Sequence, residues 1–341
     1  MKIYKNSFKI GSLIVSIILG AGFLSGKELI RFFGDFRFWG IIGIFLSSLL
    51  IGIIAYSVMK IRNRFSITTI DEFFTVIFNG NKFLGVLLSI GITLFMFIIF
   101  ATMTSAFCEL LSEHFHIKTA HSMIVFALIT FIFVYYGIDF LINLSTIMSI
   151  FMFFGCILIF IQYFVDGQEV FNNTRISMLY ANTVSYTAYN ILTTISLLVT
   201  GTHILKNKKE FALASFLGGF GVFIVGLSLF IPLTFEYSLL QDKALPIYHL
   251  LSNLQNNTSF TLLYVFIFLI AIISTGVSSF FASITAISVK PTPILTITVL
   301  ILGLYASTLG FSNFVEIVYP LFSFIGIIEI YFILNLAIKV K

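Results

Sequence analysis

The first long apolar run of the chain is interrupted near its middle by a glycine-rich stretch that two charged residues follow directly. The stretch reads Gly20-Ala21-Gly22-Phe23-Leu24-Ser25-Gly26, and Lys27 and Glu28 come next. A glycine inside a helix costs about 1 kcal/mol relative to alanine, and a charge at mid-bilayer costs about 2.5–3.5 kcal/mol on insertion scales. Irregular backbone is tolerated in a membrane only where protein buries it or where it lines a cavity. We therefore predict a discontinuous first span, whose half-helices leave backbone groups free to bind a solute.

Two other interpretations of this stretch fit the sequence less well. Lysines ahead of a short apolar run are typical of a signal peptide, but the chain after this run never takes on the composition of a soluble protein. A phosphate-binding loop is excluded by spacing. Ala21 stands where that motif needs a glycine ahead of Gly26 and Lys27, and Glu28 replaces the required Ser or Thr.

Composition places the chain among polytopic membrane proteins. Hydrophobic residues make up 59% of it, charged residues only 10%, and the mean hydropathy is +1.09. The net charge of +5 comes from residues in short loops between apolar runs, so we expect no nucleic-acid partner. Cys108 and Cys156 lie inside apolar segments without metal or redox spacing. Paired catalytic carboxylates and nucleophile–base pairs are not evident either, so we do not expect an enzyme.

Ten apolar runs follow one another, most of them near the ~20 residues that a spanning helix needs. Placing the N-terminus inside puts most of the 19 Lys and Arg residues on the cytoplasmic side. We therefore expect a multi-pass protein of the bacterial cytoplasmic membrane with both termini cytoplasmic. The runs are 8–34, 38–60, 82–112, 120–136, 138–165, 181–205, 211–235, 259–288, 293–308 and 313–338.

The spacing of these runs repeats. A polar stretch, 61–81, follows the second run, and its segment Thr69-Ile70-Asp71-Glu72 predicts a helix capping box. A comparable stretch, 236–258, follows the seventh run, with Pro246 placed to start a short helix at Ile247. One transporter domain, 1–341, would therefore contain two repeats of five spans, about 8–165 and 181–338. Because five is odd, the repeats would be inverted relative to each other. Symmetry then predicts a second break in the sixth span, at the polar and aromatic stretch 185–190. The alternative is a continuous helix that uses its hydroxyl groups for packing.

These residues resemble a known family. The stretch from Gly20 to Glu28, with Phe32-Phe33 after it, is similar to the signature of the YkvI-like bacterial membrane proteins. Those proteins resemble the amino acid–polyamine–organocation superfamily. The resemblance covers essentially the whole chain, with a departure at Lys27, where the pattern has Gln. It implies an all-α membrane protein with the LeuT fold, having ten transmembrane helices, a 5+5 inverted repeat and discontinuous helices 1 and 6.

The resemblance also implies where a solute would bind. In such transporters the broken first span presents N–H groups to a substrate carboxylate and carbonyls to its amine, and the sixth span walls the pocket. A half-helix that begins near Ser25 would favour an anion at its N-terminal end. The implied substrate-binding residues are Gly20, Ala21, Gly22, Phe23, Leu24, Ser25, Gly26, Tyr186, Tyr189 and Asn190.

The eighth run carries a candidate cation site. Thr275 lies three residues before Ser278 and four before Ser279, so the three hydroxyl groups share one helical face. In sodium-coupled relatives of the family a similar face holds sodium together with carbonyls of the first break, which implies Gly20 and Phe23 here. Neutral oxygens suit a hard cation. The alternative is that these small residues let helices approach closely.

Glu329 is an acid deep in an apolar run, and an ionisable residue there is a functional candidate by default. We expect a secondary transporter in the lipid bilayer for a small organic solute, an amino acid or related zwitterion, coupled to sodium. Proton coupling through Glu329 is one alternative. A ligand-sensing receptor on the same scaffold, resembling the spore germinant-receptor B subunits, is another. Pairing among Lys27, Glu28 and Arg31 is an alternative to their contact with a solute.

Overall fold

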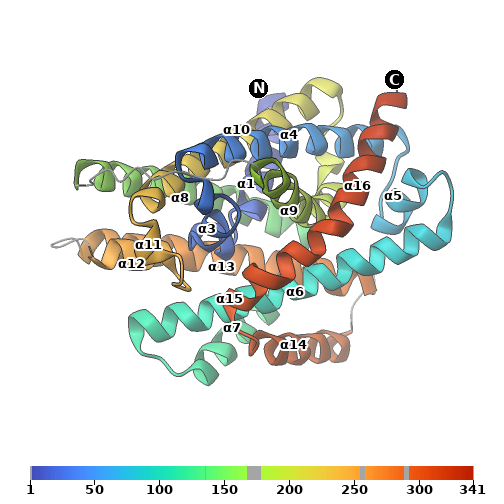
Figure 1. The fold of residues 1–341 in the computed structure, drawn as a ribbon. Coiled ribbons are helices and arrows are strands. Elements are labelled where there is room, and N and C mark those ends of the chain that lie inside the picture. The colour runs from blue at the N-terminus through green and yellow to red at the C-terminus, as the bar shows by residue number, and fades with distance from the viewer. Residues whose placement is uncertain (1, 135, 167–177, 254–257, 288–291, 341) are drawn as a thin grey trace.

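The chain forms a bundle of helices. The computed structural model describes residues 2–134, 136–166, 178–253, 258–287 and 292–340, and over these ranges every regular element is a helix (Figure 1). The helices that match the ten apolar runs begin and end within a few residues of the expected positions. They are α1 (Lys2–Ile18), α2 (Ala21–Leu24) and α3 (Lys27–Phe33) for the first run, then α4 (Gly40–Arg64), α6 (Lys82–Phe115), α7 (Thr119–Val134), α8 (Gly137–Asp166), α9 (Leu179–Gly201), α10 (Lys208–Phe235), α13 (Thr258–Ile287), α14 (Pro293–Ser307) and α16 (Tyr319–Lys339).

The helices identify a multi-pass membrane protein. Among the described residues, five helical stretches are long and apolar enough to cross a membrane, and α7 and α14 are shorter apolar helices. Large apolar side chains face outward, as on α14, where Ile294 is 78% exposed and Tyr305 79%, and a lipid-facing surface accounts for this exposure. The count of ten spans and the cytoplasmic position of the termini stay predictions. The five stretches are Lys27–Arg64, Lys82–Phe115, Lys208–Phe235, Ser259–Ile287 and Phe311–Lys339.

The two polar stretches fold into short helices at opposite ends of the bundle. The first contains α5 (Ile70–Ile77), which begins at the expected capping box of Thr69 and Glu72. The second contains α11 (Tyr237–Leu240) and α12 (Pro246–Asn253), and Pro246 begins α12 as expected. Figure 1 shows α5 at one end and α11 and α12 at the other. This placement agrees with an inverted repeat, which itself stays a prediction.

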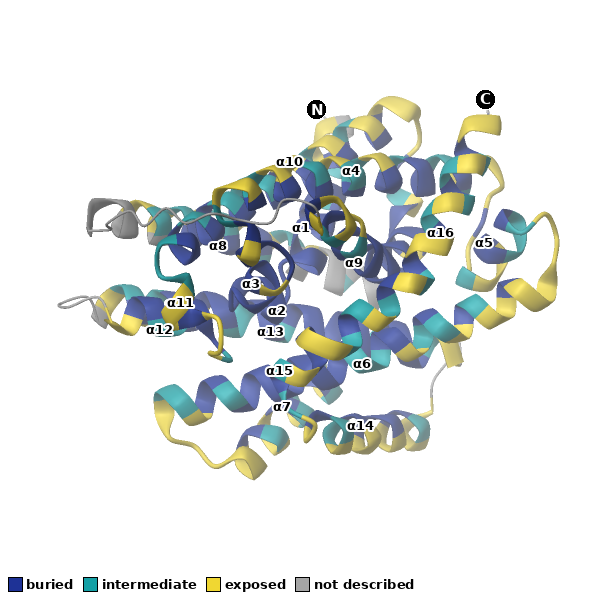
Figure 2. Ribbon diagram, in the orientation of Figure 1, coloured by how far each residue is buried: buried dark blue, intermediate teal, exposed yellow. Residues whose placement is uncertain are grey.

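The first span is discontinuous, as predicted. The hydrogen-bond ladder of α1 ends where the Leu19 N–H donates to the Val15 carbonyl at 2.9 Å. Gly20 is extended, with φ −68° and ψ −176°, and only a single helical turn, α2, follows it. Gly26 then adopts φ +83°, a left-handed conformation that glycine accepts without strain, before α3 begins. The broken segment lies at the centre of the bundle, among the most buried elements (Figure 2).

The sixth span is not broken, so the predicted discontinuity at residues 185–190 is wrong. Helix α9 continues from Leu179 to Gly201. Several of its threonines donate hydrogen bonds to the helix itself, since the Thr187 hydroxyl donates to the Thr183 carbonyl at 2.9 Å and the Thr194 hydroxyl to the Asn190 carbonyl at 2.8 Å. Polar residues alone therefore do not open this helix, because the stretch contains neither glycine nor proline.

Helix α9 packs closely against α16. The Ser185 hydroxyl donates to the Ser323 hydroxyl at 2.8 Å. One turn further along both helices, a Cβ atom added to Gly326 would lie 2.1 Å from the Ala188 carbonyl oxygen. Because that oxygen belongs to the backbone of α9, a rotamer change cannot relieve the collision. Gly326 therefore sets the distance between the two helices.

We predict that Gly326→Ala destabilises the protein by about 1–3 kcal/mol, because α9 and α16 must separate to admit the methyl group. The measurement is the thermal unfolding midpoint in detergent. Gly91→Ala on α6 is the matched control, since its nearest neighbour to the added Cβ atom, Ile325 Cδ1, is at an ordinary 3.6 Å. Equal midpoints for the two variants would contradict the close contact.

Candidate functional site

Neighbouring helices satisfy part of the backbone of the broken span. The Tyr264 hydroxyl of α13 donates to the Leu24 carbonyl at 3.1 Å. The Ile247 N–H at the start of α12 donates to the Ser25 carbonyl at 2.9 Å. The Ala21 N–H points at the sulfur of Met103 on α6, 3.4 Å away. Helices α6, α12 and α13 thus hold the break from three directions, with α12 at its Ser25 end.

The predicted substrate-binding residues lie together at this break. All of residues 20–26 are buried, as are Tyr186, Tyr189 and Asn190 of α9. Phe32 of α3 brings the two elements together, with its ring centroid 5.6 Å from that of Tyr186 and 5.4 Å from that of Tyr189. The Asn190 amide donates to the Tyr186 carbonyl of its own helix at 3.0 Å. In this structure its amide group is therefore engaged with α9 and not with the break.

Glu28 is a site residue that the sequence argument did not single out. It is 4% exposed, and its Oε2 accepts a hydrogen bond from the Tyr189 hydroxyl. A Cβ atom added to Gly22 would lie 1.9 Å from Glu28 Oε1, so the carboxylate rests directly against the break. The signal available in the sequence was the charge itself, since an acid next to a glycine break in an apolar run is costly unless it has a role.

The adjacent Lys27 pairs across the bundle and not with Glu28. Its ammonium lies 2.6 Å from Glu316 Oε1 and donates to the Gln241 carbonyl at 3.2 Å. Glu316 belongs to a π-helical turn, η4 (Phe314–Val318), which precedes α16. The Arg31 side chain also donates to the Glu316 carbonyl, at 3.4 Å. Lys27, Glu28 and Arg31 therefore do not pair with one another. Lys27 and Arg31 connect α3 to η4, and the Glu28 side chain stays in the interior of the bundle.

Three of the predicted cation ligands line one small cavity. Thr275, Ser278 and Ser279 surround a space of about 10 Å³ together with Ser16 of α1 and Thr193 of α9. A cavity of roughly 10–15 Å³ has room for one water-sized particle. The Thr275 hydroxyl donates to the Ser16 carbonyl at 3.3 Å. The cavity therefore brings hydroxyl groups of α13 to the C-terminal end of α1.

Neither of the two predicted ligands from the break lines the cavity. Gly20 adjoins the hydroxyl face, since a Cβ atom there would lie 3.3 Å from Thr275 Cγ2, but its carbonyl accepts the Leu24 N–H at 3.0 Å. The Phe23 carbonyl likewise accepts the Gly26 N–H at 3.0 Å. Ser16 and Thr193 were missed because their contribution depends on how α1, α9 and α13 pack, which spacing along the chain does not reveal.

Glu329, the candidate for proton coupling, is fully buried on α16, three residues after Gly326. Neither of its carboxylate oxygens has a hydrogen-bond partner among the described residues. Burying a carboxyl group without a partner is unfavourable in either protonation state, and most unfavourable when the group is charged. The structure therefore leaves Glu329 with no evident structural role.

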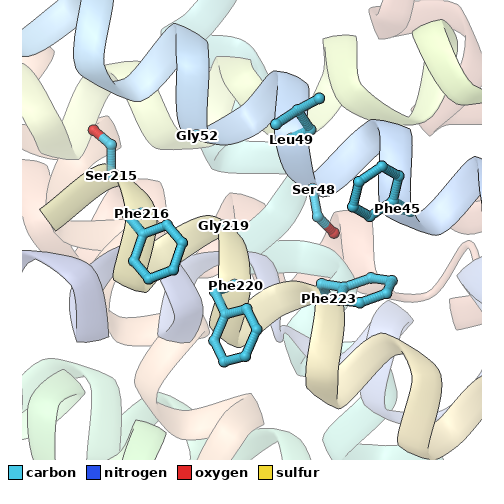
Figure 3. A pocket seen from close by; sticks show the side chains of 9 residues that line it. All are labelled: Phe45, Ser48, Leu49, Gly52, Ser215, Phe216, Gly219, Phe220 and Phe223. Carbon is cyan, nitrogen blue, oxygen red and sulfur yellow. The ribbon is translucent and has the colours of Figure 1, made fainter. Parts of the chain in front are cut away.

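A larger groove on the outside of the bundle is of a different kind. It occupies about 210 Å³ between α4 and α10, and Figure 3 shows rings from both helices facing each other across it. Phe45 and Phe216 in its lining are 48% and 62% exposed. None of the predicted site residues lines this groove. Its apolar surface is what a helix–helix boundary facing lipid acyl chains presents.

Comparison with known proteins finds similarity in structure only. No family model matches the sequence, and no curated protein matches it. A Na⁺-coupled sialic acid symporter in a substrate-bound, outward-open state has a TM-score of 0.61 at 15% identity, over 91% of this chain and 72% of that one. A manganese transporter of Eremococcus coleocola has a TM-score of 0.64 at 12% identity, over 90% and 70%.

A third similar structure is Mhp1, a nucleobase–cation–symport-1 family transporter, in a closed conformation with bromovinylhydantoin bound. It has a TM-score of 0.50 at 14% identity, over 91% of this chain and 74% of that one. These three solved proteins are transporters of the LeuT fold, and none is an enzyme. At such low identities the likeness shows that this chain has that fold. Membership of the YkvI-like group stays a prediction.

We predict that Lys27 and Glu316 are energetically coupled. Glu316→Gln leaves a buried ammonium without its counter-ion, which should cost about 1–3 kcal/mol, less than for a fully buried pair because the Glu316 side chain is 45% exposed. Combining it with Lys27→Met should recover about 1 kcal/mol or more. Thermal unfolding of the single and double variants measures this coupling. The control combines Glu316→Gln with Lys82→Met at the exposed start of α6, and those two effects should simply add.

Proposed function

We propose that this protein is a secondary transporter that moves a small organic solute across the membrane with a cation. The observation that carries the proposal is the break between α1 and α3, buried at the centre of a LeuT-type bundle. Its backbone leaves the helical ladder and faces α6, α9 and α13 there. Discontinuous helices at the middle of a transporter are where solutes and coupling ions bind. The amino acid or related zwitterion expected from the sequence would bring its carboxylate to a break against which the Glu28 carboxylate already rests.

Sodium is the coupling ion that the small cavity favours. Thr275, Ser278 and Ser279 offer neutral hydroxyl oxygens, which suit a hard cation. The last turn of α1 adds carbonyl groups, because the ladder stops at Leu19 and leaves the carbonyls before the break without i+4 donors. The C-terminal end of a helix also carries partial negative charge that attracts cations. Both contributions meet at the contact between Thr275 and Ser16.

We predict that sodium stabilises the purified protein against thermal unfolding more than potassium does, and that sodium strengthens solute binding. Each bound ligand at a hundred times its dissociation constant adds about 2.7 kcal/mol. Ser278→Ala combined with Ser279→Ala should abolish the sodium effect, because it removes two cavity oxygens. Ser283→Ala is the matched control, since this buried serine of α13 donates to its own helix, as Ser279 does, but does not line the cavity. A sodium effect that survives in the double variant would contradict this assignment.

Glu329 supports a second candidate, proton coupling, because its buried oxygens lack partners. In reconstituted liposomes, an imposed proton gradient should then drive uptake without sodium, and Glu329→Gln should abolish that uptake while leaving solute binding. Unchanged proton-driven uptake in Glu329→Gln would remove this candidate. Liposomes that bind solute but accumulate none under either gradient would favour the receptor alternative.

A further inference from the structure

Within the described part of the chain, the Glu28 carboxylate at the centre of the bundle meets no positively charged partner. Glu28 is 4% exposed, and among the residues that the structure describes no Lys, Arg or His forms an ion pair with it. The adjacent Lys27 is committed to Glu316. Removing a carboxylate from water is unfavourable unless it takes up a proton or meets a positive charge. A cationic ligand is therefore one way for this site to be completed.

Aromatic rings from three further elements surround the Tyr189 ring that holds this carboxylate. The ring of Phe32 on α3 stacks on Tyr189 with centroids 5.4 Å apart. The ring of Tyr319 on α16 lies 5.0 Å from Tyr189. The ring of Phe95 on α6 lies 5.9 Å from Tyr319 and 6.5 Å from Tyr189. Ring faces attract organic cations, whereas a small metal ion is better held by oxygen atoms.

Two buried hydroxyl groups of this cluster have room for a further hydrogen bond. Among the described residues the Tyr186 and Tyr319 hydroxyls form no hydrogen bond of ordinary geometry, and the side chains of Asn190 and Thr102 lie nearest to them. Buried hydroxyls that lack partners are unfavourable, and their oxygen atoms can accept the N–H groups of an amine. The cluster therefore offers a negative charge, ring faces and hydrogen-bond acceptors, which are the three features that recognise an ammonium group.

The same carboxylate opposes a solute that carries a carboxylate of its own. Glu28 Oε1 rests against Gly22, inside the stretch where the family resemblance places the carboxylate of an amino acid. Two negative charges in one water-excluded site repel strongly. The Leu24 and Ser25 carbonyls already accept hydrogen bonds from Tyr264 and Ile247, so an ammonium group would rely on Glu28 and the rings and not on these carbonyls. The break is thus arranged for a positive group and against a second acid.

We propose that the solute is an organic cation, an amine without a carboxylate, whose ammonium group binds between Glu28 and the rings of Phe32, Tyr186, Tyr189 and Tyr319. This inference rests on the transporter proposed above and narrows its solute from a zwitterion to a cation. In the structure these rings contact one another, so the ammonium group enters when α3 separates from α9 and α16. Such a separation is what alternating access provides.

Two matched pairs of solutes test the proposal on the unchanged protein. Ethanolamine and glycine share a primary amine, and choline and betaine share a quaternary one, while only glycine and betaine carry a carboxylate. Thermal unfolding of the full chain in sodium buffer should show stabilisation by ethanolamine or choline, with the carboxylate partner binding at least ten-fold more weakly. Tighter binding of glycine or betaine would overturn the cation assignment while supporting the transporter.

The variant Glu28→Gln tests the position of the site. The amide keeps the shape and still accepts the Tyr189 hydroxyl, so the variant should unfold at no lower temperature without ligand. Its affinity for the stabilising amine should fall at least ten-fold. Glu113→Gln, which changes a half-buried acid near the end of α6, is the matched control and should keep that affinity. Unchanged affinity in Glu28→Gln would overturn the placement.

Two remaining outcomes are also decisive. If Glu28→Gln does not fold, Phe32→Leu replaces it, because removing one ring of the cluster should weaken choline more than ethanolamine. Equal weakening or none would count against the ring cluster as the binding site. If no member of either pair binds, the cation assignment is wrong. The transporter proposal would then be tested separately, by the effect of sodium on unfolding and by the loss of that effect in the Ser278 and Ser279 double variant.

Discussion

The arrangement of the bundle depends on the interruption of the hydrogen-bond ladder after Leu19. Backbone groups released inside an apolar protein must find partners, and here α6, α12 and α13 supply several of them. The Tyr264 and Ile247 contacts to the break fix α13 and α12 around it. The positions of the hydroxyl cavity and of the aromatic cluster follow, because both are built from helices that meet at this point.

The buried charges are distributed by the same constraint. Lys27, Glu28 and Arg31 lie within about one turn of α3, where water is largely excluded. Two of them reach Glu316 on the opposite segment, η4, and thereby connect α3 to α16. The third turns inward against Gly22, whose missing side chain makes the necessary room. The negative charge of Glu28 therefore remains at the centre because Gly22 leaves room for it and Lys27 pairs with Glu316 instead.

Hydropathy and spacing were enough to predict the helices, the first break and the capping box of α5, because each depends on local sequence. The prediction of a break in α9 was wrong because repeat symmetry constrains how the helices are arranged but not the hydrogen bonds within each helix. Thr187 and Thr194 satisfy their hydroxyl groups within their own helix. Ser16, Thr193 and Tyr319 join their clusters only through packing between distant segments, which no spacing along the chain encodes. The charge of Glu28 was evident in the sequence, but the direction in which its side chain projects was not.

The close contact at Gly326 has a mechanical consequence. Because α9 is continuous and packs directly against α16 at Gly326, the two helices form one packed unit. Tyr189 lies on α9 next to this contact, and Glu329 lies on α16 three residues beyond it. A movement of α16 that displaces the Tyr319 ring therefore also displaces Glu329, because both residues lie on that helix. A solute that separates the rings by moving α16 would then change the environment of Glu329 without contacting it.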